Sequence, residues 1–317
     1  MNDNIPFSKF IVAIVIPSYR VENEIGSVIN SIPEYISYII VVNDKSPDKT
    51  EQIVKDLANT NPRIILISHE HNQGVGGAMR TGFSKAIELG VQFVVKMDGD
   101  GQMNPDYLPA LLTPLIEGKA DYAKGNRFRD FRALQQMPTL RRIGNIALSF
   151  LTKAATGYWN IFDPTNGYFA INVNVLRHIP LEKLARTYYF ETSMLAELYL
   201  LNASVKDISI PAQYGNEKSN LSIYKVLLEF PPRLLRTFLK RILFKYFLFD
   251  FSIVSLYLLT GFPLFLFGLV FGITKWIEYT LLNIPAPTGT VVLPMMSVLI
   301  GIQFMMSAIQ IDIQSTP

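Results

Sequence analysis

The sequence has no cysteine, few histidines and little net charge. Because none of its 317 residues is cysteine, disulfide bonds, thiolate catalysis and cysteine-ligated zinc are excluded. Of its three histidines, His69 and His71 lie near a glycine-rich stretch, but the sequence offers no third ligand that would indicate zinc. The formal net charge of +3 is too small to indicate a nucleic-acid binder.

Charged residues become scarce after Lys245. Two stretches there, 251–273 and 290–311, contain no charged residue at all. A transmembrane helix needs about 20 apolar residues, so both stretches are predicted to span a membrane, with Pro263 and Pro294 as tolerated kinks. Five basic residues precede the first stretch and only Lys275 lies in the connection. The positive-inside rule therefore predicts that the large N-terminal part is on the cytoplasmic face of the plasma (inner) membrane.

The segment just before these stretches, 221–248, mixes apolar residues with basic ones at spacings of mostly three to five. This pattern is typical of basic amphipathic helices that lie on an anionic membrane surface, with a solvated helix of a soluble protein as the alternative. We therefore expect three parts: a domain at 1–220, juxtamembrane helices at 221–248 and a membrane hairpin at 249–312. The start of the chain lacks a basic leader, so a signal peptide is not expected.

The first half of the chain alternates two kinds of pattern. Short runs rich in Ile and Val recur every 25 to 29 residues, at 10–16, 38–42, 63–68 and 92–97. Segments with helical spacing of apolar residues separate these runs. Such alternation predicts an α/β fold with a mostly parallel sheet covered on both faces. Further along, 167–176 and 204–212 are expected to contain strands and 190–202 a helix.

Polar residues follow the predicted strands, where ligands bind in open parallel sheets. Asp98 and Asp100 come after the fourth strand, and an i, i+2 pair can aim both carboxylates at one side. Such oxygen ligands suit Mg²⁺ or Mn²⁺, although Asp and Gly are also ordinary turn residues. Asp44, after the second strand, could accept a hydrogen bond from a nucleotide base or ribose.

Three glycines, Gly74, Gly76 and Gly77, stand before the helix that follows the third strand. They predict a close approach of the backbone to a nucleotide or its phosphates. The dinucleotide-binding pattern of glycines should instead follow the first strand, which argues against NAD.

Together these stretches resemble the inverting glycosyltransferase family 2, in its branch of polyprenyl-phosphate sugar transferases. The resemblance covers about residues 10–220 and rests on ordered motifs. They are "VIPSYRVENEI" (15–25), "VVNDKSPDKT" (41–50), "NQGVGGAMRTGF" (72–83), "DGDGQMNPDYL" (98–108), "GNRF" (125–128), "DPTNGYFAIN" (163–172) and "YGNEKSN" (214–220). It implies a Rossmann-like GT-A domain followed by membrane-associated helices.

The resemblance also implies a nucleotide-diphosphate sugar donor and a divalent metal, Mg²⁺ or Mn²⁺. UDP is the expected nucleotide and GDP the alternative. Asp100 would be the main metal ligand, with Asp98 beside the ribose and metal and Gln102 completing the site. The other donor-site residues it implies are Pro17, Tyr19, Glu22, Asp44, Gly74 and Gly76. Asn43 departs from the family pattern, which usually has an acidic residue there.

The implied acceptor is a polyprenyl phosphate such as undecaprenyl phosphate. Arg127 would face phosphate, Arg141 and Asn145 would grip the acceptor phosphate with Arg142 as a competitor for that role, and Lys218 would reach a phosphate. Asp163 would orient the acceptor or steady the transition state, with base catalysis optional.

Two other functions stay open at this stage. A membrane glycosyltransferase acting on a glycolipid or polysaccharide is one, although the Q-x-x-R-W motif of processive synthases is absent. A catalytically silent membrane scaffold is the other. Small residues in the two spans permit packing between copies, so a homo-oligomer is also an expectation.

Overall fold

The computed structural model of the chain describes residues 6–127, 139–210 and 223–317, and describes their side chains except at 139–143, 145 and 223–229. The chain forms two compact units, Met1–Phe238 and Leu239–Thr316. The boundary between them falls inside helix α9 (Ile223–Leu243), whereas the sequence boundaries at 220 and 248 lie on either side of this helix.

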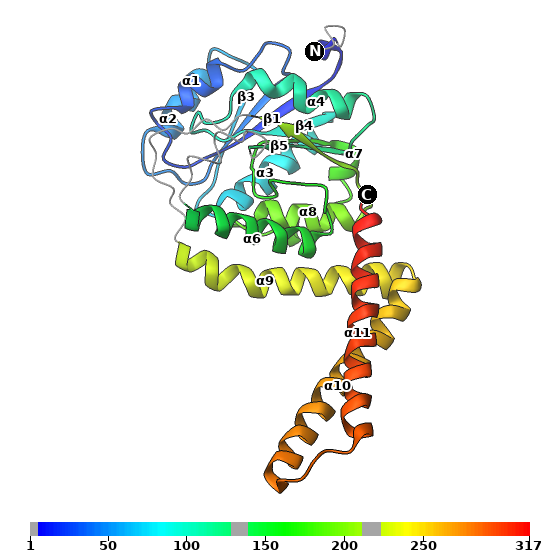
Figure 1. Cartoon of the computed structure of the whole chain (residues 1–317). Helices are drawn as coiled ribbons and strands as arrows, with labels where there is room; N and C mark the ends of the chain where they lie inside the picture. Colours follow the sequence, from blue (N-terminus) through cyan, green and yellow to red (C-terminus); the bar gives the residue numbers. More distant parts are fainter. Residues whose placement is uncertain (1–5, 128–138, 211–222) are drawn as a thin grey trace. The chain divides into compact units, whose positions relative to one another are not determined.

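A seven-stranded sheet forms the centre of the first unit (Figure 1). Its strands lie in the order β3-β2-β1-β4-β6-β5-β7, and only β6 runs antiparallel to its neighbours. The mostly parallel sheet is therefore confirmed. The strands are β1 (Val12–Ser18), β2 (Tyr38–Asn43), β3 (Ile64–Ser68), β4 (Phe93–Lys96), β5 (Tyr122–Asn126), β6 (Phe169–Asn172) and β7 (Val205–Ser209).

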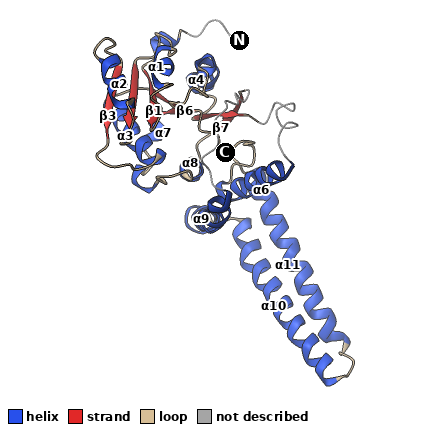
Figure 2. Ribbon diagram, turned by 90° about the vertical axis from the view of Figure 1, so that its left-hand side faces the viewer, coloured by secondary structure: helices blue, strands red, loops and turns tan. Residues whose placement is uncertain are grey.

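Helices cover both faces of this sheet, as Figure 2 shows from the side. Successive residues of a strand point to opposite faces, so Ile14 and Val15 of β1 belong to different cores. One core includes side chains of α1 (Ile25–Asn30), α2 (Thr50–Ala58) and α4 (Leu108–Ile116). The other includes side chains of α3 (Val75–Glu88), α7 (Val173–Leu176) and α8 (Phe190–Leu200).

The strand order brings distant parts of the sequence to one edge. β1 pairs in parallel with both β2 and β4, so the carboxyl ends of all three strands meet where the direction of winding changes. Phe169, at the start of antiparallel β6, is paired with Lys96 on one side and Lys124 on the other. The loop before β6 therefore lies beside the ends of β4 and β5.

Two longer helices complete the first unit. α6 (Thr139–Thr156) and the first part of α9 contribute to a small apolar cluster with Tyr189. The cluster contains Ala155, Phe230 and Leu234, and the Tyr189 hydroxyl lies 2.9 Å from Thr237 Oγ1. α9 exposes Leu235, Leu239 and Leu243 along one face, in agreement with its amphipathic pattern.

The second unit contains two long apolar helices, α10 (Ile253–Leu282) and α11 (Thr288–Gln314), which are candidate membrane spans. α10 extends past the predicted end of the first span, and Lys275 pairs with Glu278 one turn later on the same helix. The helix ends only at Asn283, which is left-handed and precedes Pro285. Lys275 therefore lies within α10, and its place between the two membrane spans stays a prediction.

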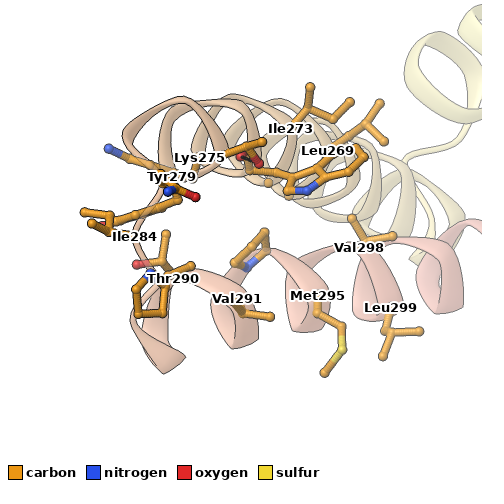
Figure 3. A pocket seen from close by; sticks show the side chains of 18 residues that line it. Leu269, Ile273, Lys275, Tyr279, Ile284, Thr290, Val291, Met295, Val298 and Leu299 are labelled. Carbon is orange, nitrogen blue, oxygen red and sulfur yellow. Dashed lines mark hydrogen bonds between the residues drawn. The ribbon is translucent and has the colours of Figure 1, made fainter.

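Small residues set the spacing between these two helices. A Cβ added at Gly301 would lie 2.6 Å from the Phe265 nitrogen, so the helices can approach this closely only at glycine. Nearer their connection the helices part around an apolar cavity of about 800 Å³ (Figure 3).

A buried ion pair anchors the end of α11 within the second unit. Both terminal nitrogens of Arg241 donate to Asp312, at 2.6 and 2.9 Å, and the Tyr246 hydroxyl donates to the same carboxylate at 2.6 Å. Tyr246 belongs to a π-helical segment, η4 (Phe244–Phe249). The remaining short helical turns are η1 (Phe7–Lys9), η2 (Pro105–Tyr107) and η3 (Leu181–Lys183).

Candidate active site

Asp44 follows β2 and organises the glycine loop at the start of α3. Its carboxylate accepts hydrogen bonds from the backbone N–H groups of Gln73 and Gly74, both at 2.8 Å. His69 Nδ1 lies 2.7 Å from the same carboxylate, and His69 Nε2 lies 2.9 Å from Thr81 Oγ1. Asp44 thus positions the loop through both carboxylate oxygens, a role that its place at a strand end did not reveal.

The glycines of this loop lie against the protein's own backbone. A Cβ at Gly74 would lie 2.5 Å from the carbonyl oxygen of Arg186, and one at Gly76 would lie 1.9 Å from that of Ala185. Gly74 also has a φ of +78°, which favours glycine. These glycines therefore allow a close approach of residues 185–186, which the sequence could not show, and the expected approach to a nucleotide stays a prediction.

Replacing Gly76 with alanine should destabilise the fold by about 1–3 kcal/mol, the usual range for overpacking a tight site. The backbone carbonyl of Ala185 would have to move, and with it the loop that Asp44 holds. Thermal unfolding of the purified chain measures this. The control is Gly26→Ala, whose added Cβ would meet only Ile53 at an ordinary 3.8 Å, and an equal loss there would contradict the explanation.

The other residues predicted for the donor side lie at the ends of β1 and β2. Pro17 is half-buried within β1, while the ring of Tyr19 is exposed, with Arg20 5.3 Å above it. Glu22 Oε2 accepts a hydrogen bond from the Lys49 N–H at 2.9 Å, which ties this segment to the residues after β2. The structure therefore places Pro17, Tyr19 and Glu22 on the side of the sheet edge where Asp44 lies.

Asp98 and Asp100 follow β4, as predicted. Asp98 is partly exposed, and its Oδ1 accepts a 2.7 Å hydrogen bond from Lys96 Nζ. Asp100 Oδ1 accepts from the Gln102 N–H at 3.0 Å, so these residues form a tight turn, and the Gln102 side chain is exposed. Within the described ranges, no group of three or more histidine, aspartate or glutamate residues could hold a metal alone.

This donor set fits Mg²⁺ or Mn²⁺ in one particular way. Mg²⁺ is commonly held by one or two carboxylates, with waters and substrate phosphates as the other ligands. A pair of partly exposed carboxylates after a rigid strand matches that arrangement. Asp98, Asp100 and Gln102 are thus the residues that would hold the ion.

A buried lysine, Lys96, supports Asp98 from within the sheet. Its ammonium lies 2.7 Å from Asp98 and 3.6 Å from Glu191 of α8, and its side chain is only 2% exposed. Burial opposes the charged form, but the two carboxylates outweigh it and raise the pKa of Lys96. A Cβ at Gly167 would lie 2.4 Å from this ammonium, so glycine is needed there to make room.

Arg127 and Asp163, predicted to have separate roles, form one ion pair. Arg127 Nε and Nη2 donate to the two carboxylate oxygens of Asp163 at 2.8 and 3.2 Å, and the Arg127 backbone N–H adds a 3.3 Å bond. Asp163 is completely buried, whereas the Arg127 side chain is 42% exposed. The carboxylate therefore holds the guanidinium, which can still meet an anion.

A second buried lysine supports the loop that carries Asp163. Lys124 Nζ donates to the carbonyl oxygen of Asn166, and its surroundings include Asp163, Glu191 and Asp207. Burial lowers the pKa of Lys124 to about 8, although these carboxylates favour its charged form. Asp207 in turn accepts from the Phe162 N–H at 2.8 Å, and burial raises its pKa.

Three predicted acceptor residues cannot be placed in the site. Arg141 and Asn145 belong to α6, but their side chains lie outside the described residues, as does that of Arg142. Lys218 lies in 211–222, also outside them.

The residues missed by the sequence analysis are mainly Lys96, Lys124, Asp207 and His69. A signal was present for Lys96, which ends an otherwise apolar strand, but not for Lys124, whose strand has the mixed sequence YAKGN. A charged residue in such a position is buried only when it is paired.

Comparison with known proteins identifies a family and relatives of the chain. The family described as glycosyl transferase family 2 matches residues 13–179. The UDP-N-acetylglucosamine–dolichyl-phosphate N-acetylglucosaminyltransferase of Methanococcus voltae is 34% identical over 191 residues, 56% of this chain and 76% of that protein. The undecaprenyl-phosphate mannosyltransferase of Micrococcus luteus is 30% identical over 201 residues, 62% of this chain and 81% of that protein.

A solved structure shares the fold. Glucosyl-3-phosphoglycerate synthase from Mycobacterium tuberculosis, in complex with Mn²⁺, UDP and glucosyl-3-phosphoglycerate, aligns with a TM-score of 0.54 and 20% identity. The alignment covers 73% of this chain and 80% of that one. At this identity the likeness shows the fold alone.

Proposed function

Because the chain belongs to glycosyl transferase family 2, we propose that it transfers a sugar from a nucleotide-diphosphate sugar to a polyprenyl phosphate at a membrane surface. One observation carries the proposal. Pairing of β6 with β4 and β5 brings the Arg127–Asp163 pair to the sheet edge where Asp98 and Asp100 lie. A cationic group for an acceptor phosphate thus lies on the same edge as carboxylates for a metal and diphosphate.

The donor would occupy the carboxyl ends of β1, β2 and β4. Asp44 fixes the glycine loop, and the exposed ring of Tyr19 can stack on a nucleobase. We expect the donor to be a UDP-sugar, in keeping with the UDP named for the Methanococcus relative and the UDP bound by the structural neighbour. Asp98, Asp100 and Gln102 would hold a bound Mg²⁺ or Mn²⁺. The ion would neutralise charge on the departing diphosphate.

The acceptor phosphate would meet Arg127. Its planar guanidinium is fixed by Asp163 on one side, and arginine suits phosphate oxygens. Arg141, Asn145 and Lys218 are further candidates for this role. A phosphate oxygen would form the new bond to the anomeric carbon while the bond from that carbon to the diphosphate breaks, which inverts the configuration and releases the nucleoside diphosphate.

No base is required to start this step. A phosphate monoester has a second pKa of about 6 and is largely ionised near neutral pH. Asp163, buried and bonded to Arg127, is therefore proposed to orient the arginine and not to remove a proton.

The two candidate spans and the basic residues before them support a membrane location. We propose that the domain at 1–220 is catalytic and cytoplasmic, that 221–248 lies on the inner (plasma) membrane surface, and that 249–312 crosses it as a hairpin. Undecaprenyl phosphate is the acceptor we would test first, since it is named for the Micrococcus relative.

The test is to incubate the purified full-length chain in detergent with undecaprenyl phosphate, Mg²⁺ or Mn²⁺ and a panel of nucleotide sugars. We expect one donor to give a glycolipid that mild acid cleaves. No product with any donor would contradict the proposal.

Replacing Asp163 with asparagine should lower turnover about tenfold to a hundredfold, because misplacing a binding group by about 1 Å can have that effect. Asparagine keeps the shape but loses the charge that holds the Arg127 guanidinium. Turnover is measured at saturating donor. Thr165→Val is the control, since it removes only a 3.4 Å bond to Asp163; full turnover in Asp163→Asn would remove this residue from the mechanism.

A further inference from the structure

A polar groove of about 530 Å³ lies on the α3 side of the first unit, and its lining includes neither Asp98 nor Asp100. One wall is a face of α3, with Arg80, Thr81 and Ser84. The other wall comes from the segment between α7 and Arg186. The volume is within the usual range for small-ligand sites.

The groove is strongly basic. Arg80, Arg177 and Arg186 line it from three separate segments, against a single carboxylate, that of Glu182. Within the described part of the chain, none of these three guanidinium groups forms an ion pair or a side-chain hydrogen bond. Three cationic side chains around one groove favour the binding of an anion.

One neutral residue of the groove adds a donor for an anion. Gln73 contributes a side-chain amide, whereas the Ser84 hydroxyl already donates to the Arg80 carbonyl oxygen at 3.0 Å and Thr81 Oγ1 lies 2.9 Å from His69 Nε2. Arginine's rigid fork of donors matches phosphate oxygens in two-point contacts. The chemistry of the lining therefore favours a phosphate group.

Two direct links connect this groove to the glycine loop. The Gly76 N–H donates to the Arg186 carbonyl oxygen at 2.8 Å. Thr81 Oγ1 lies 2.9 Å from His69 Nε2, and His69 Nδ1 lies 2.7 Å from Asp44, which holds Gln73 and Gly74. An anion bound to Arg186 and beside Thr81 would restrain the residue that accepts from the Gly76 N–H and the residue that contacts His69.

We propose that the groove binds a phosphate-bearing anion and that its occupancy orders the Gln73–Gly76 loop for the nucleotide sugar. The proposal that an anion binds depends only on the groove, whereas the proposal that the anion orders the loop rests on the proposed function. The anion is either a soluble phosphate ester or the headgroup of an anionic phospholipid.

Binding is tested on the full-length chain carrying Arg127→Gln, so that the proposed acceptor site does not contribute. The probes are inorganic phosphate, glycerol 3-phosphate and nanodiscs of phosphatidylglycerol against phosphatidylcholine, at matched ionic strength without nucleotide. Adding Arg80→Gln and Arg177→Gln together should weaken binding at least tenfold. Lys85→Gln, on the same helix but outside the groove, should change it less than twofold.

The probes separate the two sources. Saturable binding of glycerol 3-phosphate supports a soluble ligand, and a response confined to phosphatidylglycerol discs supports a headgroup. Equal binding by the double variant and the Lys85→Gln control with every probe overturns the site, provided that unliganded thermal midpoints show both to be folded.

Coupling is tested by titrating UDP with Mn²⁺ into the chain with native Arg127, with and without the better probe. We expect UDP to bind about fivefold more tightly with the probe, at the low end of allosteric couplings, and to lose that gain in the Arg80→Gln/Arg177→Gln variant. Unchanged UDP affinity despite probe binding overturns the coupling alone. Absence of UDP binding under all conditions contradicts the proposed function and leaves the anion site standing.

Discussion

Asp100→Asn should reduce sugar transfer by about 10²–10³-fold, the range for removing one charge-stabilising group from an active site. The substitution keeps the size of the side chain and the acceptor for the Gln102 N–H, so the turn after β4 is preserved. It removes the negative charge proposed to hold the cation against the leaving diphosphate. Transfer is measured with the best donor of the panel, over a range of Mn²⁺ concentrations.

The matched control is Asp106→Asn. Asp106 is exposed six residues later and accepts a 3.1 Å hydrogen bond from Asn104, with no part in the proposed site. We expect it to keep near-normal transfer. Equal transfer by Asp100→Asn and Asp106→Asn would contradict the metal-site assignment. Full cellular function of an Asp100→Ala chain would favour the scaffold alternative.

Lys96→Met should destabilise the first unit by about 3–5 kcal/mol, the range for removing one partner of a buried ion pair. The Lys96 ammonium lies between Asp98 and Glu191 beneath Gly167, and no other ion pair involving these two carboxylates is present in the described residues. Without it the two carboxylates would face each other, and Asp98 would lose its fixed orientation. The midpoint of thermal unfolding and the rate of sugar transfer should therefore fall together.

Lys85→Met controls for the loss of a lysine, because its pair with Glu88 is exposed and such pairs contribute little. A Lys96→Met/Glu191→Gln chain should recover part of the stability, since the second change removes one unpaired charge. Equal unfolding midpoints for Lys96→Met and Lys85→Met would show that the Lys96 ammonium does not balance these carboxylates. No recovery of stability on adding Glu191→Gln would show the same.

The sequence was sufficient to predict the features that depend on neighbouring residues. Runs of Ile and Val revealed β1 to β4, and the positions of Asp44 and Asp98 after their strands followed from them. Both candidate spans were evident from the absence of charge. Local pattern is enough for these features, because strand burial and helix length are recorded in consecutive residues.

Features that join distant segments could not be predicted. The Arg127–Asp163 pair joins residues 36 positions apart, and it depends on β6 lying antiparallel between β4 and β5. Lys96 meets Glu191 across 95 positions, and Gly76 meets a carbonyl from the segment before α8. Such contacts depend on topology, which residue spacing does not record.

The same limit explains why the protein partners of Asp163 and Asp44 were not foreseen. Asp163 is wholly buried against Arg127, and Asp44 holds the glycine loop, while the ligand roles expected of both stay predictions. The two carboxylates hold the Arg127 guanidinium and the glycine loop, which are groups that could contact a ligand. Residue type and place in a motif indicated the site, and only the fold separates such a support from a ligand contact.

In the proposed reaction a sugar, and not a sugar phosphate, passes from the nucleotide to a lipid phosphate. Mass and ³¹P NMR spectra of the purified glycolipid distinguish these two transfers. We predict a single phosphodiester joined to the sugar with inverted anomeric configuration, together with one equivalent of nucleoside diphosphate. A lipid diphosphate accompanied by nucleoside monophosphate, or a product with retained configuration, would contradict the account.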